Sequence, residues 1–324
     1  MDSKNDLKTG LLCAFTCYLI WGFISIYWEL TEGAGSWEVI AHRIVWTPFF
    51  ILLWVSITRK TAELAHALKA IFTTRLFFWV FFASGFACVN WWVNVIAVFT
   101  NHVIELGIGL FMTPLFSVLC GIVFFRERLT RLESFSVALA LAGLVSLLID
   151  YGSFPWIAFG VSSSWAVYGT IKKKLKLDGT YSVMAETLLV FPFAFAYLVY
   201  LHRLGVGQFS PSFDTAMSWT LIGVGLITVV PMITFGIAAV KLPLTILGFF
   251  QYINPILTLL VGVFYFSEPV TTSEIKALAF ILPAIAIFVR EKTLKSRNAG
   301  RTPVKIQPKN NNPHCDSCSD THAH

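Results

Sequence analysis

Charged side chains are scarce in this sequence. Only 13% of its 324 residues are Asp, Glu, Lys or Arg, whereas 56% are hydrophobic, and a soluble domain usually carries about 25% charged residues. Apolar stretches of about 18 to 25 residues follow one another from Leu11 to Val289. The composition excludes a water-soluble globular protein and predicts an all-α integral membrane protein.

The common motifs of ATP-driven and hydrolytic sites are also missing. The sequence contains no P-loop, no Gly-x-Ser-x-Gly and no His-Glu-x-x-His. We therefore expect neither an enzyme nor a bound cofactor. The first apolar run, Leu11 to Leu30, lacks a small-residue cleavage site, so it is interpreted as a membrane helix rather than a signal peptide.

The six cysteines do not indicate a disulfide framework. Those inside apolar runs, where cysteine behaves as a small hydrophobic residue, are Cys13, Cys17, Cys88 and Cys120. Near the C-terminus, His314, Cys315 and Cys318 form a CxxC motif whose ligand types suit Zn²⁺ or Cu⁺. A tail that merely tolerates these residues is the alternative, and we expect no metal in the core.

Ten membrane helices are expected, near 8–30, 37–58, 75–99, 102–125, 132–150, 155–171, 181–202, 215–240, 243–266 and 272–290. Lys and Arg gather in alternate connections, namely before residue 9 and at 59–75, 126–131 and 172–176. The positive-inside rule then places these loops and both termini in the cytoplasm. We expect a multi-pass protein of a bacterial-type cytoplasmic (inner) membrane, whose net charge of +6 reports topology and not nucleic-acid binding.

The second half of the sequence repeats the first. At an offset of 141 residues Leu106 pairs with Leu247, Pro114 with Pro255, Gly121 with Gly262 and Glu127 with Glu268, and at an offset of 144 Trp21 pairs with Trp165. Because each copy holds an odd number of helices, the second must enter the membrane from the opposite side. The predicted units are 1–150, an inverted copy at 151–290, and a disordered cytoplasmic tail at 291–324. The alternative is that Pro and Gly recur wherever membrane helices bend or pack closely.

Several strings resemble one known family. They are WGF (Trp21–Phe23), AHRIVW (Ala41–Trp46), NWWVN (Asn90–Asn94), VIELGIGLFMTPL (Val103–Leu115) and LGFFQYINP (Leu247–Pro255). Together they resemble the RarD branch of the EamA-type drug/metabolite transporter superfamily. The resemblance implies a ten-helix permease with cytoplasmic termini and a central substrate cavity. Where relatives carry Tyr-Phe-Ile-Asn-Pro, this chain reads Leu110-Phe111-Met112-Thr113-Pro114, which implies a different substrate preference.

Ionisable residues inside the predicted helices are candidate site residues, because a charge near the bilayer centre costs about 2.5 to 3.5 kcal/mol on insertion scales. Arg43 and Glu105 both enter from the predicted outer side. They are a candidate pair that holds a substrate carboxylate or an outer gate, and the alternative is a structural ion pair.

His42 and Glu186 occupy corresponding positions of the two copies. Both are candidates for proton exchange during transport, since histidine titrates near neutral pH and burial raises the pKa of a glutamate. For Glu186 the alternative is an ion pair with Lys241 or Lys172 at the inner mouth.

Amide and aromatic side chains provide further candidates. Asn90 and Asn94 share one helix face beside Trp91, so they predict a polar ligand wall, with interhelical bridging as the alternative. Trp21 and Tyr168 are weaker candidates, because aromatic residues gather at membrane interfaces for other reasons.

Proline marks a possible interruption of the same helices. Paired interruptions in the two copies indicate a transporter site, although a packing kink is the alternative. The prolines in corresponding positions are Pro114 with Pro255 and Pro48 with Pro192, and the polar residues before Pro255 are Gln251, Tyr252 and Asn254.

These observations predict a secondary transporter that moves a small amphipathic or zwitterionic metabolite or drug by alternating access, with a proton or another ion as a possible coupling partner. Its other partner is the lipid bilayer. A structural or assembly membrane protein, which would have a closed interior, is one alternative. An intramembrane enzyme that uses His42 and Glu186 as acid and base is the other.

Overall fold

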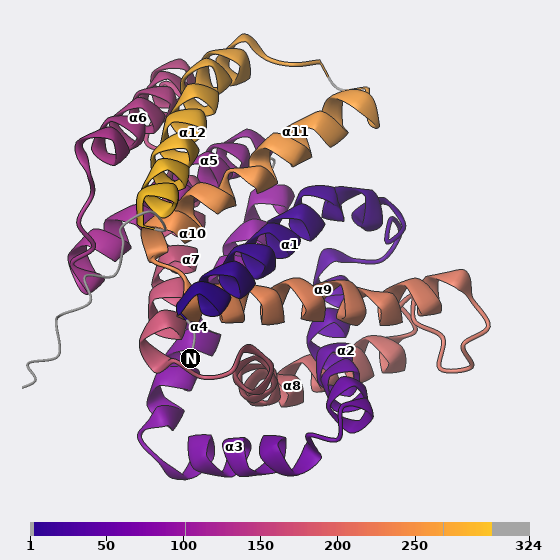
Figure 1. The fold of residues 1–324 in the computed structure, drawn as a ribbon. Coiled ribbons are helices and arrows are strands. Elements are labelled where there is room, and N and C mark those ends of the chain that lie inside the picture. Colours follow the sequence, from indigo (N-terminus) through magenta and orange to yellow (C-terminus); the bar gives the residue numbers. More distant parts are fainter. Residues whose placement is uncertain (1–2, 101, 268, 300–324) are drawn as a thin grey trace, which may run out of the picture.

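The computed structural model describes residues 3–100, 102–267 and 269–299. All regular secondary structure in these residues is helical, which confirms the predicted all-α class (Figure 1). The helices are α1 (Ser3–Glu29), α2 (Ser36–Ile57), α3 (Thr61–Thr73), α4 (Leu76–Phe99), α5 (Val103–Phe125), α6 (Arg131–Tyr151), α7 (Trp156–Leu175), α8 (Gly179–Leu204), α9 (Ala216–Lys241), α10 (Leu244–Gln251), α11 (Ile253–Phe264) and α12 (Thr272–Ala299). The metal candidates His314, Cys315 and Cys318 lie outside the described residues, as does the predicted tail from residue 300 onward.

Nine segments of the described chain are long and apolar enough to cross a membrane. One of them, Leu244–Phe264, is formed by α10 and α11 together. The predicted helix at 155–171 corresponds to α7, which is 20 residues long but carries three adjacent serines and ends in three lysines. Because α7 packs against α4, α5 and α9, its buried serines Ser162 and Ser164 meet other helices instead of lipid.

One helix, α3, was not predicted, and α12 ends well after its predicted end. Helix α3 lies within the predicted basic loop, and its 13 residues are too few to span a bilayer. It buries Leu64 and Ile71 on one face, which is typical of a helix that lies along the bundle surface. Helix α12 continues to Ala299, past the predicted end at 290, because residues 291–299 contain neither Pro nor Gly.

The predicted paired helix breaks occur in one copy only. Helices α2, α5 and α8 run without a break through Pro48, Pro114 and Pro192 respectively. The chain divides only before Pro255, between α10 and α11. Neighbouring helices satisfy the carbonyl groups that an internal proline frees, so a proline by itself does not decide where a membrane helix ends.

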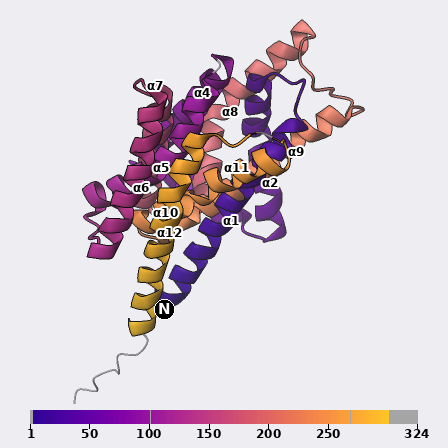
Figure 2. The same cartoon turned by 90° about the horizontal axis from the view of Figure 1, so that it is seen from above.

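Helices of the first half, α1–α6, pack against helices of the second half, α7–α12. Helix α6 lies beside α12 and α2 beside α8, on opposite sides of the bundle (Figure 1). Helices α4 and α7 run side by side in both views (Figures 1 and 2). Helix α1 packs against α9 and α11, and α5 packs against α7 and α10. The largest buried cluster therefore contains residues of both halves.

Helices α6 and α12 begin with the same capping arrangement. The Thr130 hydroxyl accepts a hydrogen bond from the Glu133 N–H at 3.2 Å, and the Glu133 carboxylate accepts one from the Thr130 N–H at 3.0 Å. Thr271 and Glu274 repeat these bonds at 3.2 and 2.8 Å. Each capping box satisfies two N–H groups that a helix start leaves free, so a short local pattern sets both helix starts.

Contacts between connections show which of them lie at the same end of the bundle. We call one the lysine-rich end, where Glu63 accepts a hydrogen bond from Tyr181 and Lys241 pairs with Asp6. It contains α3 and the connections at 126–130, 176–178 and 242–243. We call the other the lysine-poor end, which contains the connections at 30–35, 152–155 and 205–215.

Candidate functional site

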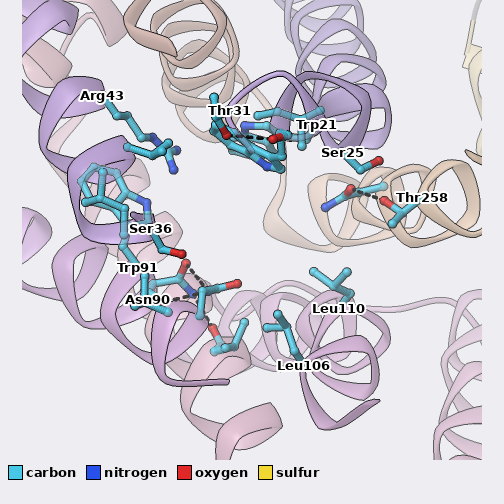
Figure 3. A pocket seen from close by; sticks show the side chains of 18 of the residues that line it. Trp21, Ser25, Thr31, Ser36, Arg43, Asn90, Trp91, Leu106, Leu110 and Thr258 are labelled. Atoms are coloured by element: carbon cyan, nitrogen blue, oxygen red, sulfur yellow. Dashed lines mark hydrogen bonds between the residues drawn. The ribbon is translucent and has the colours of Figure 1, made fainter. Parts of the chain in front are cut away.

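A cavity of about 850 Å³ lies among α1, α2, α4, α5, α7, α10 and α11 (Figure 3). At the lysine-poor end its lining includes the connection between α1 and α2 and Phe266, and deep in the bundle it includes Tyr18, Trp165 and Gln251. Tryptophans, amides, threonines and one arginine make up much of its wall. Both the size and the mixed lining are typical of small-molecule sites, which occupy about 300 to 1,000 Å³.

One wall of the cavity carries the predicted amides of α4. The side-chain N–H₂ of Asn90 donates to the Val161 carbonyl at 2.9 Å and to the Ser164 hydroxyl at 3.2 Å, and that of Asn94 donates to the Asn90 carbonyl at 2.7 Å. Asn90 therefore lines the cavity and also bridges α4 to α7. The two interpretations of this residue, ligand wall and interhelical bridge, are compatible.

The facing wall is built around the break between α10 and α11. Gln251 ends α10, and its side-chain oxygen accepts a hydrogen bond from the Ser117 hydroxyl of α5 at 2.9 Å. Asn254 accepts one from Thr258 at 3.3 Å, and Figure 3 shows Thr258 across the cavity from Asn90. The predicted bend before Pro255 thus lies at the cavity and places two amides in its wall.

Aromatic rings from α1 and α7 form the floor of the cavity, and Phe235 of α9 lies behind them. Trp21 lies edge-on to Trp165 at a centroid distance of 5.2 Å and to Tyr18 at 5.7 Å. Trp165 also packs against Phe235 at 4.9 Å and Tyr168 at 5.0 Å. We call these five residues the aromatic floor. Below Trp165 the rings of Tyr168 and Phe235 are fully buried, so the cavity ends there.

Arg43 brings a positive charge to the cavity wall. It lies seven residues after the start of α2 at Ser36, about 10 Å along the helix. Its guanidinium carbon is 4.5 Å from the centroid of the Trp91 ring, which is a cation–π contact. The Nε atom of Arg43 is buried and has no hydrogen-bond partner.

The predicted pair of Arg43 with Glu105 does not form. Both carboxylate oxygens of Glu105 are engaged, by the Tyr151 hydroxyl at 2.9 Å and by the Ile157 N–H at 2.6 Å. Ile157 is in the first turn of α7, where backbone N–H groups are free and attract a carboxylate. Glu105 is therefore buried outside the cavity wall, where it fixes the start of α7.

His42 likewise points away from the cavity. Its Nδ1 accepts a hydrogen bond from the Trp46 ring N–H at 3.1 Å, and its ring packs against Phe209 at 4.8 Å. Its Nε2 is 4.0 Å from a Glu38 carboxylate oxygen, and that oxygen accepts the N–H groups of Gln208 and Phe209. These contacts hold the connection between α8 and α9 against α2.

Glu186 belongs to a buried polar cluster behind the aromatic floor. Its carboxylate lies 2.7 Å from the Lys172 ammonium and accepts hydrogen bonds from Ser182 at 2.7 Å and Tyr168 at 2.9 Å. All four side chains are buried. Of the two lysines considered from the sequence, Lys172 is the partner, whereas Lys241 pairs with Asp6. Glu186 and His42 thus have separate partners. The acid and the base of one active site would instead lie together.

Tyr168 and Tyr252 lie near the cavity without lining it. Tyr168 is fully buried and packs against Trp165, whose ring centroid is 5.0 Å away and which does line the cavity. Tyr252 is 1% exposed and packs against Phe249 at 6.1 Å, in the cluster that joins α5 and α10 to α6 and α12. Successive side chains of a helix point about 100° apart. Gln251 therefore lines the cavity, whereas Tyr252 points away from it.

At the lysine-rich end the bundle is closed by Glu127 and Lys173. The Glu127 carboxylate accepts hydrogen bonds from the backbone N–H groups of Leu244 at 2.7 Å and Thr245 at 2.9 Å, in the first turn of α10. The Lys173 ammonium lies 3.6 Å from Glu127 and also donates to the Leu242 carbonyl. These contacts join the connection between α5 and α6 in the first half to α7 and α10 in the second.

No family model matches this chain. It is 32% identical to Protein RarD of Salmonella typhi over 299 residues, which cover 92% of this chain and 99% of that protein. It is 31% identical to Protein RarD of Escherichia coli K12 over 301 residues, which cover 93% and 100%. This chain belongs to the RarD family.

Other relatives extend the comparison. A Bacillus subtilis protein described as the uncharacterized transporter YojE is 30% identical over 285 residues, which cover 87% of this chain and 94% of that protein. A protein of known crystal structure shares the fold with a TM-score of 0.68 at 18% identity, covering 90% of this chain and 99% of the other. The RarD-family chain is thus a multi-pass membrane protein of a transporter family.

Several residues that line the cavity of this RarD-family protein were not predicted from the sequence. Tyr18, Thr113, Trp165 and Thr258 line the cavity but were not among the candidates. Trp165 corresponds to Trp21 in the repeat, Tyr18 and Thr258 lie one helical turn from Trp21 and Asn254, and Thr113 directly precedes Pro114, so the repeat and helical spacing were the available signals.

Proposed function

We propose that this protein is a secondary carrier that moves a small amphipathic or zwitterionic solute across the cytoplasmic membrane by alternating access. The observation that carries the proposal is the asymmetry of the cavity. It reaches the loops at the lysine-poor end, while Glu127 and Lys173 close the lysine-rich end with contacts between the halves. Such contacts separate when two halves rock about a central site.

An inverted duplication supports this mechanism. Under the sequence repeat α1 corresponds to α7 and α4 to α9, and the structure pairs α1 with α9 and α4 with α7. If each helix is replaced by its counterpart in the other half, the α1–α9 contact becomes the α7–α4 contact. The contacts of α2 with α8 and of α6 with α12 each join a helix to its own counterpart. The two equal capping boxes at Thr130 and Thr271 have the same origin under this proposal.

The orientation of the proposed carrier follows from its charges. The positive-inside rule assigns the lysine-rich end and both termini to the cytoplasm. This orientation requires ten spans, which are the nine apolar segments and α7. The cavity of this state opens to the outside. The direction of net transport depends on the solute gradients and not on this state.

The two alternatives have less support. An assembly protein has no need of a large cavity lined by amides and one arginine. An intramembrane enzyme that uses His42 and Glu186 needs the two side chains in contact, whereas each has its own set of partners.

Cysteine accessibility tests the proposed carrier. In a background in which the native cysteines are replaced, Ser36→Cys reports the cavity mouth and Leu247→Cys, which is 1% exposed at the closed end, reports the opposite side. Glu127→Gln weakens the closure, so we expect a several-fold rise in labelling of the Leu247→Cys reporter and a matching fall for the Ser36→Cys reporter. The reagent is a water-soluble maleimide applied to protein in lipid nanodiscs, where both ends of the bundle are accessible.

The matched control is Asp150→Asn. Asp150 forms an ion pair with Lys276 at 3.0 Å, between α6 and α12 at the lysine-poor end, away from the Glu127 closure. We expect it to leave both labelling rates unchanged. A Glu127→Gln variant in which the two reporters do not change in opposite directions would contradict alternating access.

A further inference from the structure

The charge of Arg43 is not balanced by the protein. Among the described residues that line the cavity, Arg43 is the only basic one. No carboxylate of the described chain lies within ion-pair distance of it, and its Nε finds no hydrogen-bond partner. A guanidinium has five N–H donors, and the contact with Trp91 satisfies none of them by a hydrogen bond.

The nearby glutamates are committed elsewhere. Glu105 binds Tyr151 and the first turn of α7, and Glu38, five residues before Arg43, binds the connection between α8 and α9. Glu29 and Glu32 line the cavity only at its mouth, where both are exposed. Glu29 raises the pKa of Tyr265 by accepting its hydrogen bond, so its carboxylate is turned toward the end of α11.

The acidic mouth does not cancel this positive site. Exposed charges are screened within a Debye length of about 8 Å at physiological salt. Arg43 is half-buried against the Trp91 ring in a low-dielectric bundle, where a charge interacts more strongly with a ligand. An anion that passes the mouth therefore meets an arginine with free donors.

We propose that the cavity selects a small organic anion, a carboxylate carried on an apolar or aromatic body, and that Arg43 is the residue that selects it. This inference rests on the proposed transport function, because it assigns a substrate class to the same cavity. A carboxylate accepts two parallel N–H bonds from a guanidinium. The rings of Trp21 and Trp91 (Figure 3), together with that of Trp165, offer the apolar surface for the rest of the ligand.

A purely structural Arg43 makes a different prediction. If the cation–π contact with Trp91 only fixed α2 to α4, replacing Arg43 would weaken all ligands alike or none. If Arg43 binds the ligand carboxylate, the replacement removes a preference between ligands of the same shape. The test therefore compares ligands that differ only in charge.

The experiment measures the dissociation constants of six compounds for the full chain in lipid nanodiscs at pH 7.5, by titration calorimetry. The probes are 3-phenylpropionate and hexanoate, each with its primary amide and its amine analogue. We expect each carboxylate to bind about tenfold more tightly than its amide and its amine, as one charge-assisted pair provides. Arg43→Gln abolishes the preference and Arg43→Lys retains part of it.

Arg203→Gln is the matched control, because Arg203 is an exposed cation at the end of α8 that does not line the cavity. It leaves the preference intact. Equal binding of carboxylates and amides, a preference that survives Arg43→Gln, or no binding of either carboxylate overturns the proposal. The labelling test at Ser36 and Leu247 is independent of these ligands, so a failure of the substrate class is distinguishable from a failure of alternating access.

Discussion

At the lysine-poor end the helices part around a cavity with an exposed acidic mouth, whereas at the lysine-rich end the same helices are joined by buried and half-buried ion pairs. The closed end uses Lys172 with Glu186 and Lys173 with Glu127. The open end places Glu29 and Glu32 in solvent. The comparison shows that buried charges form ion pairs between segments at the closed end, whereas the carboxylates at the cavity mouth are exposed to solvent.

The largest expected effect comes from breaking the buried pair at the closed end. Lys172→Met leaves the Glu186 carboxylate buried without its cation, so we expect the free energy of unfolding to fall by about 3 to 5 kcal/mol. Equilibrium unfolding in detergent micelles measures the loss. The double variant Lys172→Met with Glu186→Gln removes both charges and recovers much of it. A single variant within about 1 kcal/mol of the parent protein would show that the pair contributes little to the closed end.

A medium effect is expected where α10 approaches α5 beneath the cavity. A Cβ atom at Gly248 would lie 2.8 Å from the Pro114 carbonyl oxygen, so Gly248→Ala forces the helices apart and costs about 1 to 3 kcal/mol. Its partner in the sequence repeat, Gly107, has no neighbour within 4 Å of the same atom. Gly107→Ala is therefore the control, and we expect it to leave unfolding unchanged or to stabilise the helix. If both variants lowered the free energy of unfolding equally, the close approach of α10 to α5 at Gly248 would not be the cause of the loss.

The smallest effect is expected at the open mouth. Glu32 is exposed, so Glu32→Gln changes the free energy of unfolding by less than about 0.5 kcal/mol. Unfolding at low and at physiological salt checks this, because a surface charge matters less as salt rises. A loss comparable to that of Lys172→Met would mean that the mouth, too, is held together by its charges.

The candidate site was predictable from the sequence where residue type and helical spacing act together. Asn90, Asn94, Gln251 and Asn254 line the cavity as expected, since amides in a membrane helix face other helices or a polar space. The partners of charged residues were not predictable. Arg43 and His42 are neighbours in the chain, yet about 100° of helix rotation directs one to the cavity and the other to Phe209.

The sequence by itself determined the helical membrane class, most helix boundaries, the capped starts at Thr130 and Thr271, and membership of the RarD family, because these depend on local composition, spacing and identity. Only the tertiary structure decided that Glu105 fixes the start of α7, that Lys172 neutralises Glu186, and that Arg43 forms no ion pair with a carboxylate of the described residues. The physical reason is that pairing between charges in a low-dielectric bundle is set by which helix faces meet, and those faces belong to segments far apart in the chain.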